Sequence, residues 1–266
     1  SALVAYSSLT HTFSLLQNVG HLINSGATHG CIENFAYVVT PTHWHVFDAE
    51  DAQWYSYNYT PPGNPGATIL EDVRGKKDYI FLHVSLLNEI PSTLVAYSIQ
   101  TKSFAERNLD YQSSPYLLDH GFTFYYYHFS GPFYCGGYSA FTGNFSMKNS
   151  AELISPHPPG YYPEIVTQKI TYGFTMHEPL SNEFYRRWLW IYNTVAGSFG
   201  EYWYVIDYAG TNAVPRGLHC GGQFAVDWVQ NVGYMDQMEC IVYYASNNSF
   251  NNFFSPLYYY GGIYTN

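Results

Sequence analysis

The sequence predicts an all-β protein, and three observations lead to that prediction. Charged residues make up only 11% of the 266 residues, whereas aromatic residues make up 20% and include 29 tyrosines. Tyr, Phe, Trp, Thr and Val suit a pleated, half-buried surface, while the helix-forming residues Glu, Lys and Ala are sparse. The third observation is a short aromatic pattern that returns along the whole chain.

The pattern is eight residues long, with an aromatic residue at its first and eighth positions and a polar segment between them. Its six copies, called copies one to six in chain order, are YSSLTHTF (6–13), FDAEDAQW (47–54), YSIQTKSF (97–104), YSAFTGNF (138–145), YNTVAGSF (192–199) and YYASNNSF (243–250). Their eighth residues follow one another at steps of 41, 50, 41, 54 and 51 residues. Six matches at this spacing indicate a structural repeat.

Each copy is predicted to be a β-hairpin. Strand-like residues such as TLVAY and RRWLWIY precede the first aromatic residue, the polar segment makes a tight turn, and the second aromatic residue opens the return strand. The two rings are then expected to meet, as aromatic pairs do in sheets. A further apolar strand is expected upstream of most copies, at 33–40, 78–85, 122–129, 169–176 and 223–230. With room for one more short strand, each period predicts four strands.

Four short strands in a period of 40 to 50 residues are typical of a β-propeller blade. The turn pattern Y-x-x-x-T-x-x-F/W resembles the inner hairpin of kelch-like propeller repeats, in which Tyr and Trp flank a polar turn. The Gly-Gly doublets at 136–137, 221–222 and 261–262 do not fall at one place in the repeat, as a kelch pattern requires. The resemblance therefore implies the fold and assigns no family.

The resemblance implies a single β-propeller domain over residues 1–266. We expect six blades, with a five-bladed ring as the alternative. The first strand, ALVAYSS, has no upstream partner in the repeat, and PLYYYGGIYTN at 256–266 looks like the missing one. N- and C-terminal strands that share a blade would close the ring and hide the sheet edges.

Charge and sequence motifs favour an extracellular location. The formal net charge is −10 with only 10 Lys and Arg, and no basic stripe is present, so we expect no nucleic-acid partner. No apolar run approaches the roughly 20 residues of a transmembrane helix. Asn58, Asn144 and Asn247 each begin a glycosylation sequon, which predicts a secreted or cell-surface glycoprotein.

The four cysteines are Cys31, Cys135, Cys220 and Cys240. They permit three complete pairings, and their spacing fits no zinc template. A disulfide between Cys220 and Cys240 is the preferred pairing. The alternative is four buried free thiols.

Three histidines are candidate ligands of a divalent metal. His29 and His120 each lie sixteen residues after the eighth position of the preceding copy, and His219 lies twenty residues after it. These places are expected beside the central channel, where three imidazoles with open coordination positions suit a transition metal. The alternative is that each histidine hydrogen-bonds a neighbouring blade, in which case no cofactor is bound.

Other polar residues give weaker indications. His43 and His45 alternate along one strand, and an exposed edge pair without a ligand is the favoured interpretation. No serine elbow, P-loop or dinucleotide motif is present, so no catalytic residue is assigned. The acids that suit a glycosidase pair, without any indication of their separation, are Glu33, Glu71, Asp72, Asp119, Asp207 and Asp227.

Tyrosine-rich segments at 58–66, 156–164 and 258–266 are the remaining candidate feature. They are expected to be loops or termini, where tyrosine is not needed for a core and suits sugar stacking or protein contacts. The alternative is that Pro and Tyr stiffen long loops. The binding residues assigned to these segments are Tyr161, Tyr162, Tyr258, Tyr259 and Tyr260.

The sequence therefore favours a secreted, tyrosine-rich, non-catalytic module that assembles with other copies of itself or recognises glycans or proteins. The alternative is an extracellular polysaccharide hydrolase or lyase with a channel-mouth His/Asp site, with or without a metal. Fold class alone does not decide between them.

Overall fold

The computed structural model of the chain describes residues 3–16, 27–60, 69–86, 91–110, 113, 115–127, 133–149, 170–179, 184–207, 214–220, 223–231 and 237–256. Within these ranges all regular secondary structure is β-strand, as the composition predicts, and no helix is present. The chain divides into two compact units, residues 1–117 with 143–145, and residues 118–142 with 146–266. Each unit is described separately.

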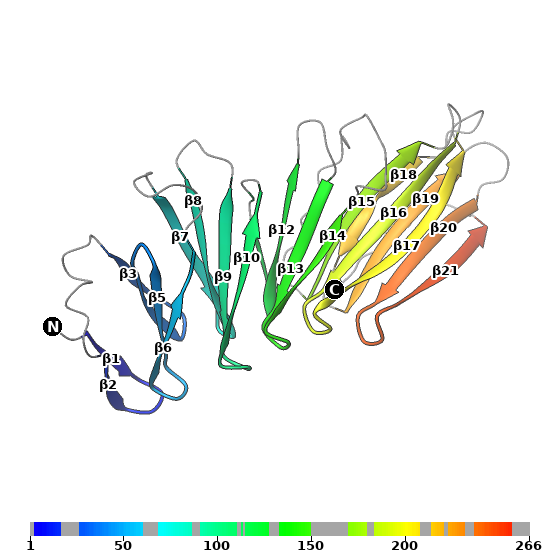
Figure 1. The fold of residues 1–266 in the computed structure, drawn as a ribbon. Helices are drawn as coiled ribbons and strands as arrows, with labels where there is room; N and C mark the ends of the chain where they lie inside the picture. Colours follow the sequence, from blue (N-terminus) through cyan, green and yellow to red (C-terminus); the bar gives the residue numbers. More distant parts are fainter. Residues whose placement is uncertain are drawn as a thin grey trace. The chain divides into compact units, whose positions relative to one another are not determined.

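The strands of the first unit form three antiparallel sheets (Figure 1), with the orders β1-β2, β3-β4-β5-β6 and β10-β9-β8-β7. Their bounds are β1 Leu3–Ser7, β2 Thr12–Leu16, β3 Thr28–Ile32, β4 Phe35–Val39, β5 His43–Asp48, β6 Gln53–Asn58, β7 Ile69–Lys76, β8 Tyr79–Leu86, β9 Ser92–Ser98 and β10 Ser103–Leu109.

The remaining strands form three more sheets, with the orders β11-β12-β13-β14, β15-β16-β17 and β18-β19-β20-β21. Their bounds are β11 Tyr116–Leu118, β12 Gly121–Tyr127, β13 Phe133–Ser139, β14 Asn144–Asn149, β15 Thr171–Pro179, β16 Phe184–Asn193, β17 Ser198–Asp207, β18 Val214–Cys220, β19 Phe224–Asn231, β20 Gln237–Tyr244 and β21 Ser249–Pro256. Four small four-stranded sheets thus follow the predicted repeat.

The copies of the eight-residue pattern are hairpins, as predicted. In copies one, two, three, five and six the first aromatic residue lies directly opposite the eighth. Their ring centroids are 4.9 to 5.4 Å apart in the pairs Tyr6–Phe13, Phe47–Trp54, Tyr97–Phe104, Tyr192–Phe199 and Tyr243–Phe250. In the four-stranded sheets this hairpin joins the third and fourth strands.

The sixth residue of every copy adopts a left-handed backbone conformation. Its φ angle lies between 50° and 67° in His11, Ala52, Lys102, Gly143, Gly197 and Asn248. Four residues must reverse the chain between the paired second and seventh positions, and a left-handed residue completes such a turn. Glycine and asparagine adopt this conformation readily, whereas other L-residues are strained by about 1–2 kcal/mol.

The left-handed position gives a first testable prediction. Gly197→Val is expected to lower the free energy of unfolding by about 2 kcal/mol or more, because a β-branched residue is strained at φ +66°. A Cβ there would also lie 2.6 Å from Thr142 Oγ1. Ala52→Gly relieves strain at the equivalent place and is expected to be neutral or stabilising by up to about 1 kcal/mol. Urea denaturation of both variants checks this, and equal destabilisation would contradict it.

The second residue of a copy ties its turn to the next sheet. Ser7 Oγ donates to the carbonyl oxygen of Ala49 at 2.5 Å, and Asn193 Nδ2 donates to that of Ala245 at 2.8 Å. Both acceptors are the third residue of the following copy. Ser139 Oγ makes the same bond to the carbonyl of Thr194.

The same side chains also organise their own turns. The backbone N–H of Thr10 donates to Ser7 Oγ at 3.1 Å, and that of Val195 donates to Asn193 Oδ1 at 3.0 Å. Short polar side chains favour such local bonds to turn amides. The polar second position therefore serves both its own turn and the contact between sheets.

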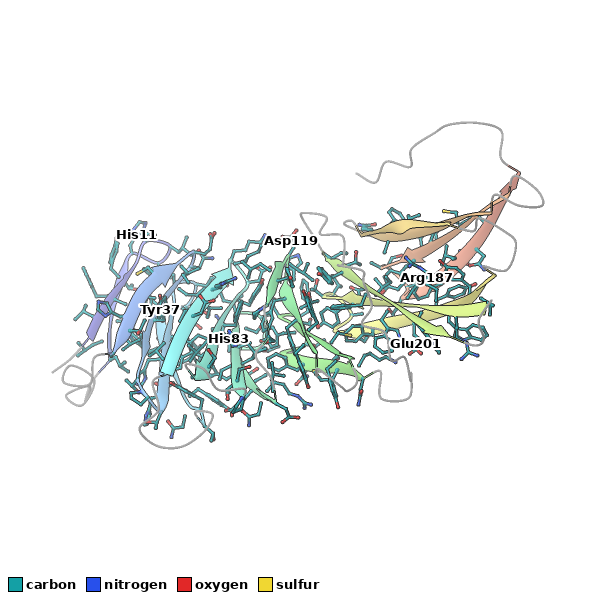
Figure 2. The ribbon with its side chains drawn as sticks, turned by 90° about the horizontal axis from the view of Figure 1, so that it is seen from above. His11, Tyr37, His83, Asp119, Arg187 and Glu201 are labelled. Carbon is teal, nitrogen blue, oxygen red and sulfur yellow. The ribbon has the colours of Figure 1, made fainter. Side chains whose placement is uncertain are left out.

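Aromatic rings fill the space between the β3–β6 and β7–β10 sheets, and Figure 2 shows side chains packed between the sheets of this unit. Trp44 and Tyr57 lie 5.5 and 5.2 Å from the ring of Phe104, and Tyr55 lies 5.1 Å from that of Tyr97. Trp44 and Tyr97 are fully buried. The repeated ring pair is thus a core element of the unit.

Candidate functional site

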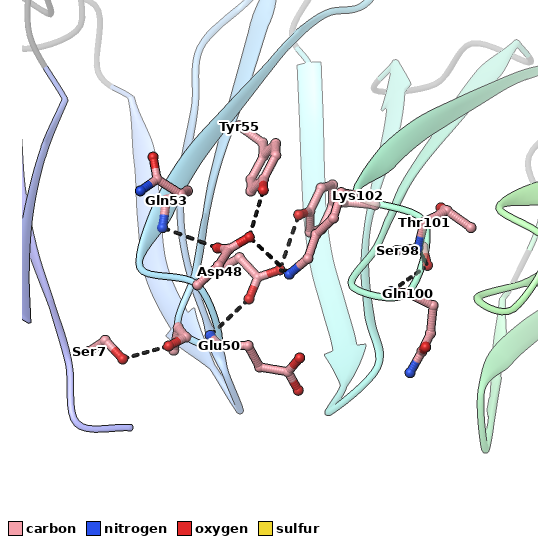
Figure 3. Close-up of polar contacts among 12 residues, drawn as sticks. Ser7, Asp48, Glu50, Gln53, Tyr55, Ser98, Gln100, Thr101 and Lys102 are labelled. Carbon is pink, nitrogen blue, oxygen red and sulfur yellow. Dashed lines mark hydrogen bonds and ion pairs between the residues drawn. The ribbon is translucent and has the colours of Figure 1, made fainter. Parts of the chain in front are cut away.

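The most elaborate polar site among the described residues lies at the turns of copies two and three (Figure 3) and is called the Asp48 cluster. The carboxylate of Asp48 is completely buried and its Oδ2 accepts from Lys102 Nζ at 2.8 Å and from the Tyr97 hydroxyl at 3.1 Å. Its Oδ1 accepts the backbone N–H of Glu50 at 3.0 Å. Every bond to this buried charge therefore comes from a turn residue or from the next sheet.

Asp51 and Tyr55 complete the Asp48 cluster. The Tyr55 hydroxyl donates to Asp51 Oδ2 at 2.7 Å, and Lys102 Nζ lies 3.1 Å from the same oxygen. Burial alone would raise the pKa of Asp51, but the bonds from Tyr55 and Lys102 hold it below its usual value. Burial likewise opposes the charge on Lys102, and its bonds to the two carboxylates nevertheless raise its pKa.

These protonation states make the Asp48 cluster a structural contact. The lowered pKa of Asp51 and the raised pKa of Lys102 both favour the charged forms, so neither of these two groups is poised to transfer a proton near neutral pH. Asp48 is the second residue of copy two and takes the place that Ser7 and Asn193 take in other copies. The cluster is therefore a charged contact between sheets at the same position of the repeat, with Asp48 as the acceptor in place of a donor.

No motif in the sequence predicts the Asp48 cluster. The available signal was that copy two alone has an acid at its second position, and copy three alone has a lysine at its sixth position. Because the partners are 54 residues apart in the chain, their pairing depends on the packing of neighbouring sheets.

The three candidate metal ligands occupy different structural places. His29 is an exposed residue within β3, opposite Val38, whereas His120 lies in the turn between β11 and β12 with φ 62°. His219 lies on β18. The connection that precedes β3 is longer than the one that precedes β11, so equal sequence offsets do not give equal positions. The described ranges contain no group of three or more His, Cys, Asp or Glu arranged to hold a metal ion.

His43 and His45 share one face of β5, as predicted, but the expectation of an exposed edge pair is wrong. β5 is the third strand of four, covered along its outer side by β6. His45 is only 7% exposed, and its Nδ1 lies 2.7 Å from Ser56 Oγ. The two imidazoles stack with centroids 6.0 Å apart.

His83 on β8, labelled in Figure 2, is a buried histidine that no sequence motif indicates. Burial lowers its pKa, and nearby Arg74 lowers it further, while Asp72 opposes the shift. Its sequence signal was weak, because a lone histidine in an apolar strand fits a core position equally well. His83 is therefore neutral at physiological pH.

The candidate glycosidase acids are dispersed along both units. Asp72 forms an exposed ion pair with Arg74 at 2.8 Å, of a kind that contributes at most about 1 kcal/mol. Glu33 and Asp119 lie in two-residue turns after β3 and β11. The others lie on strands, Glu71 on β7, Asp207 on β17 and Asp227 on β19.

The predicted glycosylation sites all lie at the surface. Asn58 ends β6, Asn144 begins β14, and Asn247 lies in the turn of copy six, and the three side chains are exposed. Asn247 Oδ1 accepts from the Ser249 hydroxyl at 2.7 Å. Exposure at turns and strand ends is compatible with glycosylation, which stays a prediction. The predicted binding tyrosines Tyr161, Tyr162, Tyr258, Tyr259 and Tyr260 lie outside the described residues.

The strand register argues against the predicted Cys220–Cys240 bridge. Cys220 lies opposite Ala225 and Cys240 opposite Trp228, so the two cysteines are on strands separated by β19 and are offset by three residues. With standard strand spacings this separates the two α-carbons by about 14 Å, whereas a disulfide needs less than about 7 Å. Cys135 is fully buried, and burial raises the pKa of its thiol.

Exposed apolar side chains gather on one face of the β1–β2 hairpin, here called the head face. Val4, Tyr6, Phe13 and Leu15 are 63%, 51%, 75% and 50% exposed. They share a face because Tyr6 pairs with Phe13 and Val4 with Leu15 in the register. The opposite face of the hairpin packs on the β3–β6 sheet through Ser7. The sequence does not show that copy one exposes its first aromatic residue, whereas the equivalent Tyr97 of copy three is buried.

The β18–β21 sheet also carries exposed aromatic side chains, on the face turned away from Tyr243 and Phe250, here called the tail face. Phe224 and Phe253 are 42% and 48% exposed on this face. Phe224 contacts Tyr244 with ring centroids 5.3 Å apart.

A third exposed aromatic group lies on β16 and β17. The Arg186 guanidinium lies 5.6 Å from the ring of Trp188 and 4.6 Å from that of Trp203, which is 48% exposed. Arg186 therefore spans the two rings in cation–π contacts, which stabilise such a ladder at a surface.

Comparison with known proteins gives a fold likeness only. No protein-family model and no curated protein matches the sequence. The chain is similar to the WD40 domain of SCAP from fission yeast, with 10% identity, 99% of this chain and 84% of that one covered, and a TM-score of 0.28. It is similar to the N-terminal domain of Nup159, with 11% identity, coverages of 82% and 60%, and a TM-score of 0.27.

A mutant apocarotenoid oxygenase from Synechocystis is a further similar structure, with 8% identity, coverages of 89% and 63%, and a TM-score of 0.28. The chain thus spans less than two thirds of that protein and of the Nup159 domain. At these identities and TM-scores the likenesses assign no family to the chain. In the described part of the chain no helix is long and apolar enough to cross a membrane.

Proposed function

We propose that this chain is a secreted, non-catalytic β-propeller module that acts by binding, through self-assembly or through recognition of glycans or proteins. The observation that carries the proposal is the exposed apolar surface of β17, where Trp203 and Val205 lie two residues apart on one face and are each 48% exposed. Soluble proteins that leave contiguous apolar surface exposed commonly use it for association.

The turns support a structural role for the rest of the repeat. Their second residues make hydrogen bonds within the turn and to the next sheet. In the Asp48 cluster the carboxylates, the ammonium group and the tyrosine hydroxyls bond to one another. These groups hold sheets together and are not arranged to bind and transform a small substrate. The three exposed sequon asparagines support secretion.

The finer description of the fold is part of the proposal. Six copies of the hairpin favour six blades over five, and strands from both ends of the sequence sharing one blade would close the ring. The tyrosines at 161–162 and 258–260 are proposed to contribute binding surface, because tyrosine offers a broad apolar ring with a polar hydroxyl.

A single set of measurements tests this function. The purified protein is expected to assemble with rising concentration in light scattering, or to bind defined glycans on an array, and either behaviour is expected to survive EDTA. A stoichiometric metal that is lost in His29→Ala or His120→Ala, together with cleavage of a polysaccharide, would instead establish the hydrolase or lyase. Absence of assembly, binding and cleavage would also refute the proposal.

A further inference from the structure

The β17 strand is the longest edge strand of the described sheets. It spans ten residues, whereas β6, β10, β14 and β21, the last strands of the other four-stranded sheets, span six, seven, six and eight. In the described residues its sheet has the order β15-β16-β17, so β17 pairs with β16 on one side and with no strand on the other. Such an edge presents a row of backbone N–H and C=O groups to which a further strand can bond.

The sequence of β17 lacks the features by which proteins usually protect an edge. Residues 202–206 are YWYVI, an uninterrupted run of aromatic and β-branched residues without Lys, Arg or Pro. By contrast, β10 carries Glu106 and Arg107, β14 carries Lys148, β21 ends at Pro256, and β6 is short. Charged residues, proline and shortness all discourage pairing with another chain. Among these last strands, β17 alone combines length with an apolar run.

The strand is nevertheless held firmly within its own unit. Tyr204 is only 7% exposed and packs with Leu189 and Ile241 on one face of the sheet. The opposite face carries Trp203 and Val205, each 48% exposed. One fixed face, one exposed apolar face and an unpaired edge in the described sheet make β17 a rigid template for a further strand.

We propose that β17 pairs along this edge with β17 of a second copy of the chain, antiparallel, with the two Trp203 residues opposite each other. This inference rests on the self-assembly proposed above and specifies its interface. Antiparallel pairing of two identical strands has two-fold symmetry, the commonest symmetry of protein dimers. The contact uses only the outer edge of one sheet in the interior of the sequence. It is therefore compatible with a closed ring and independent of what lies before the first copy or after the last.

Side-chain faces and charge favour this register over its neighbours. With Trp203 on the two-fold axis, residues 199–207 pair with the same residues in reverse order, and Val205 lies opposite Glu201 of the second copy. Aromatic residues directly opposite each other stabilise an antiparallel pair. Moving the axis by one residue toward the C-terminal end of the strand would place Glu201 opposite Asp207, and like charges in that arrangement are unfavourable.

A second copy suits this edge better than an unrelated ligand. Backbone hydrogen bonds to an edge require an extended peptide, and only an identical strand necessarily supplies an aromatic residue opposite Trp203. The charge of Glu201, close to the axis, is balanced by an ion pair with Lys148 of the same chain. Each copy carries a formal charge of −10, so added salt should screen the remaining repulsion and strengthen association.

The test uses two variants of the full chain, Trp203→Lys and Trp203→Glu. Wild-type protein is expected to pass from monomer to dimer with rising concentration in sedimentation velocity. Each variant alone is expected to dimerise with a Kd raised about tenfold or more, because the aromatic pair is lost and like charges meet on the axis. An equimolar mixture is expected to form a heterodimer with most of the lost affinity restored, because opposite charges then meet at the same position.

Controls separate loss of the interface from loss of the fold and from a change in net charge. Phe141, 42% exposed in the turn of copy four, is the matched position. Phe141→Lys and Phe141→Glu change the net charge equally and are expected to dimerise like wild type. Trp203→Glu places a carboxylate beside Arg186, so its fold is expected to be retained, as far-ultraviolet circular dichroism would show.

Three results would overturn the inference. Dimerisation of Trp203→Lys and Trp203→Glu at the wild-type Kd would place the interface elsewhere. A mixture no tighter than either variant alone would show that Trp203 does not lie opposite itself. A wild-type monomer at every concentration would exclude the dimer, and glycan binding by that monomer would leave the proposed binding function intact. Failure of this inference is therefore distinguishable from failure of the function.

Discussion

Replacing Trp44 by alanine is expected to lower the free energy of unfolding by about 3–5 kcal/mol, the range for truncating a buried aromatic side chain. Trp44 is fully buried between two sheets of the first unit, where its ring contacts that of Phe104 with centroids 5.5 Å apart. Truncation removes the burial of the indole and leaves a cavity, since β-sheet backbone on both sides restricts collapse. Urea denaturation followed by tryptophan fluorescence measures the loss.

Trp203→Ala is the matched control for Trp44→Ala. The Trp203 ring is 48% exposed and contacts Arg186 at 4.6 Å, so its removal is expected to cost about 1 kcal/mol, chiefly the cation–π contact and partial burial. Comparable losses in the two variants would show that the Trp44 site is not a tightly packed core position.

The hairpins of the fold could be predicted from the sequence because their determinants are local. An aromatic residue at each end of a polar segment sets the strand, turn and return strand, and the observed register places Tyr97 opposite Phe104 as expected. The apolar strand upstream was predictable for the same reason. It is a short, strongly apolar run such as residues 78–85, most of which form β8.

The left-handed sixth position was harder to recognise, because its occupants share no chemistry. Gly143, Gly197 and Asn248 suit a left-handed backbone, but His11 and Lys102 do not suggest it in isolation. Only alignment of the six copies shows the common position. The turn geometry therefore overrides residue preference in half of the copies.

Contacts between sheets could not be predicted, because they join residues about 50 places apart. In the local sequence Asp48 is typical of a turn residue, and its partner Lys102 is typical of a solvent-exposed lysine. The equal sequence offsets of His29 and His120 were misleading for a related reason. Connections between sheets vary in length, so equal distances along the chain end at different points of the strands.

Buried tyrosines are expected to make the protein unfold at high pH. Tyr97 and Tyr192 are completely buried, and burial raises the pKa of both hydroxyls, with Asp48 adding to the shift at Tyr97 and Tyr138 at Tyr192. In the unfolded chain these groups ionise near pH 10. Below that pH both states keep the proton, so the stabilising contribution is complete and independent of pH.

Above pH 10 the unfolded state releases protons that the folded state retains, so the free energy of unfolding falls as pH rises. Each buried tyrosine is expected to contribute about 1.4 kcal/mol per pH unit, giving about 2.7 kcal/mol per unit for Tyr97 and Tyr192 together. Urea denaturation between pH 8 and pH 11 measures this slope.

The variant Tyr97→Phe isolates the contribution of Tyr97 to this alkaline slope from that of Tyr192. It is expected to reduce the alkaline slope by about 1.4 kcal/mol per pH unit. At neutral pH the same change removes one hydrogen bond to Asp48, which remains bonded to Lys102, so the loss there is expected to be about 1 kcal/mol. A variant whose slope equals that of wild type would show that the Tyr97 hydroxyl reaches solvent in the folded protein, and that the turns of copies two and three are not closed together.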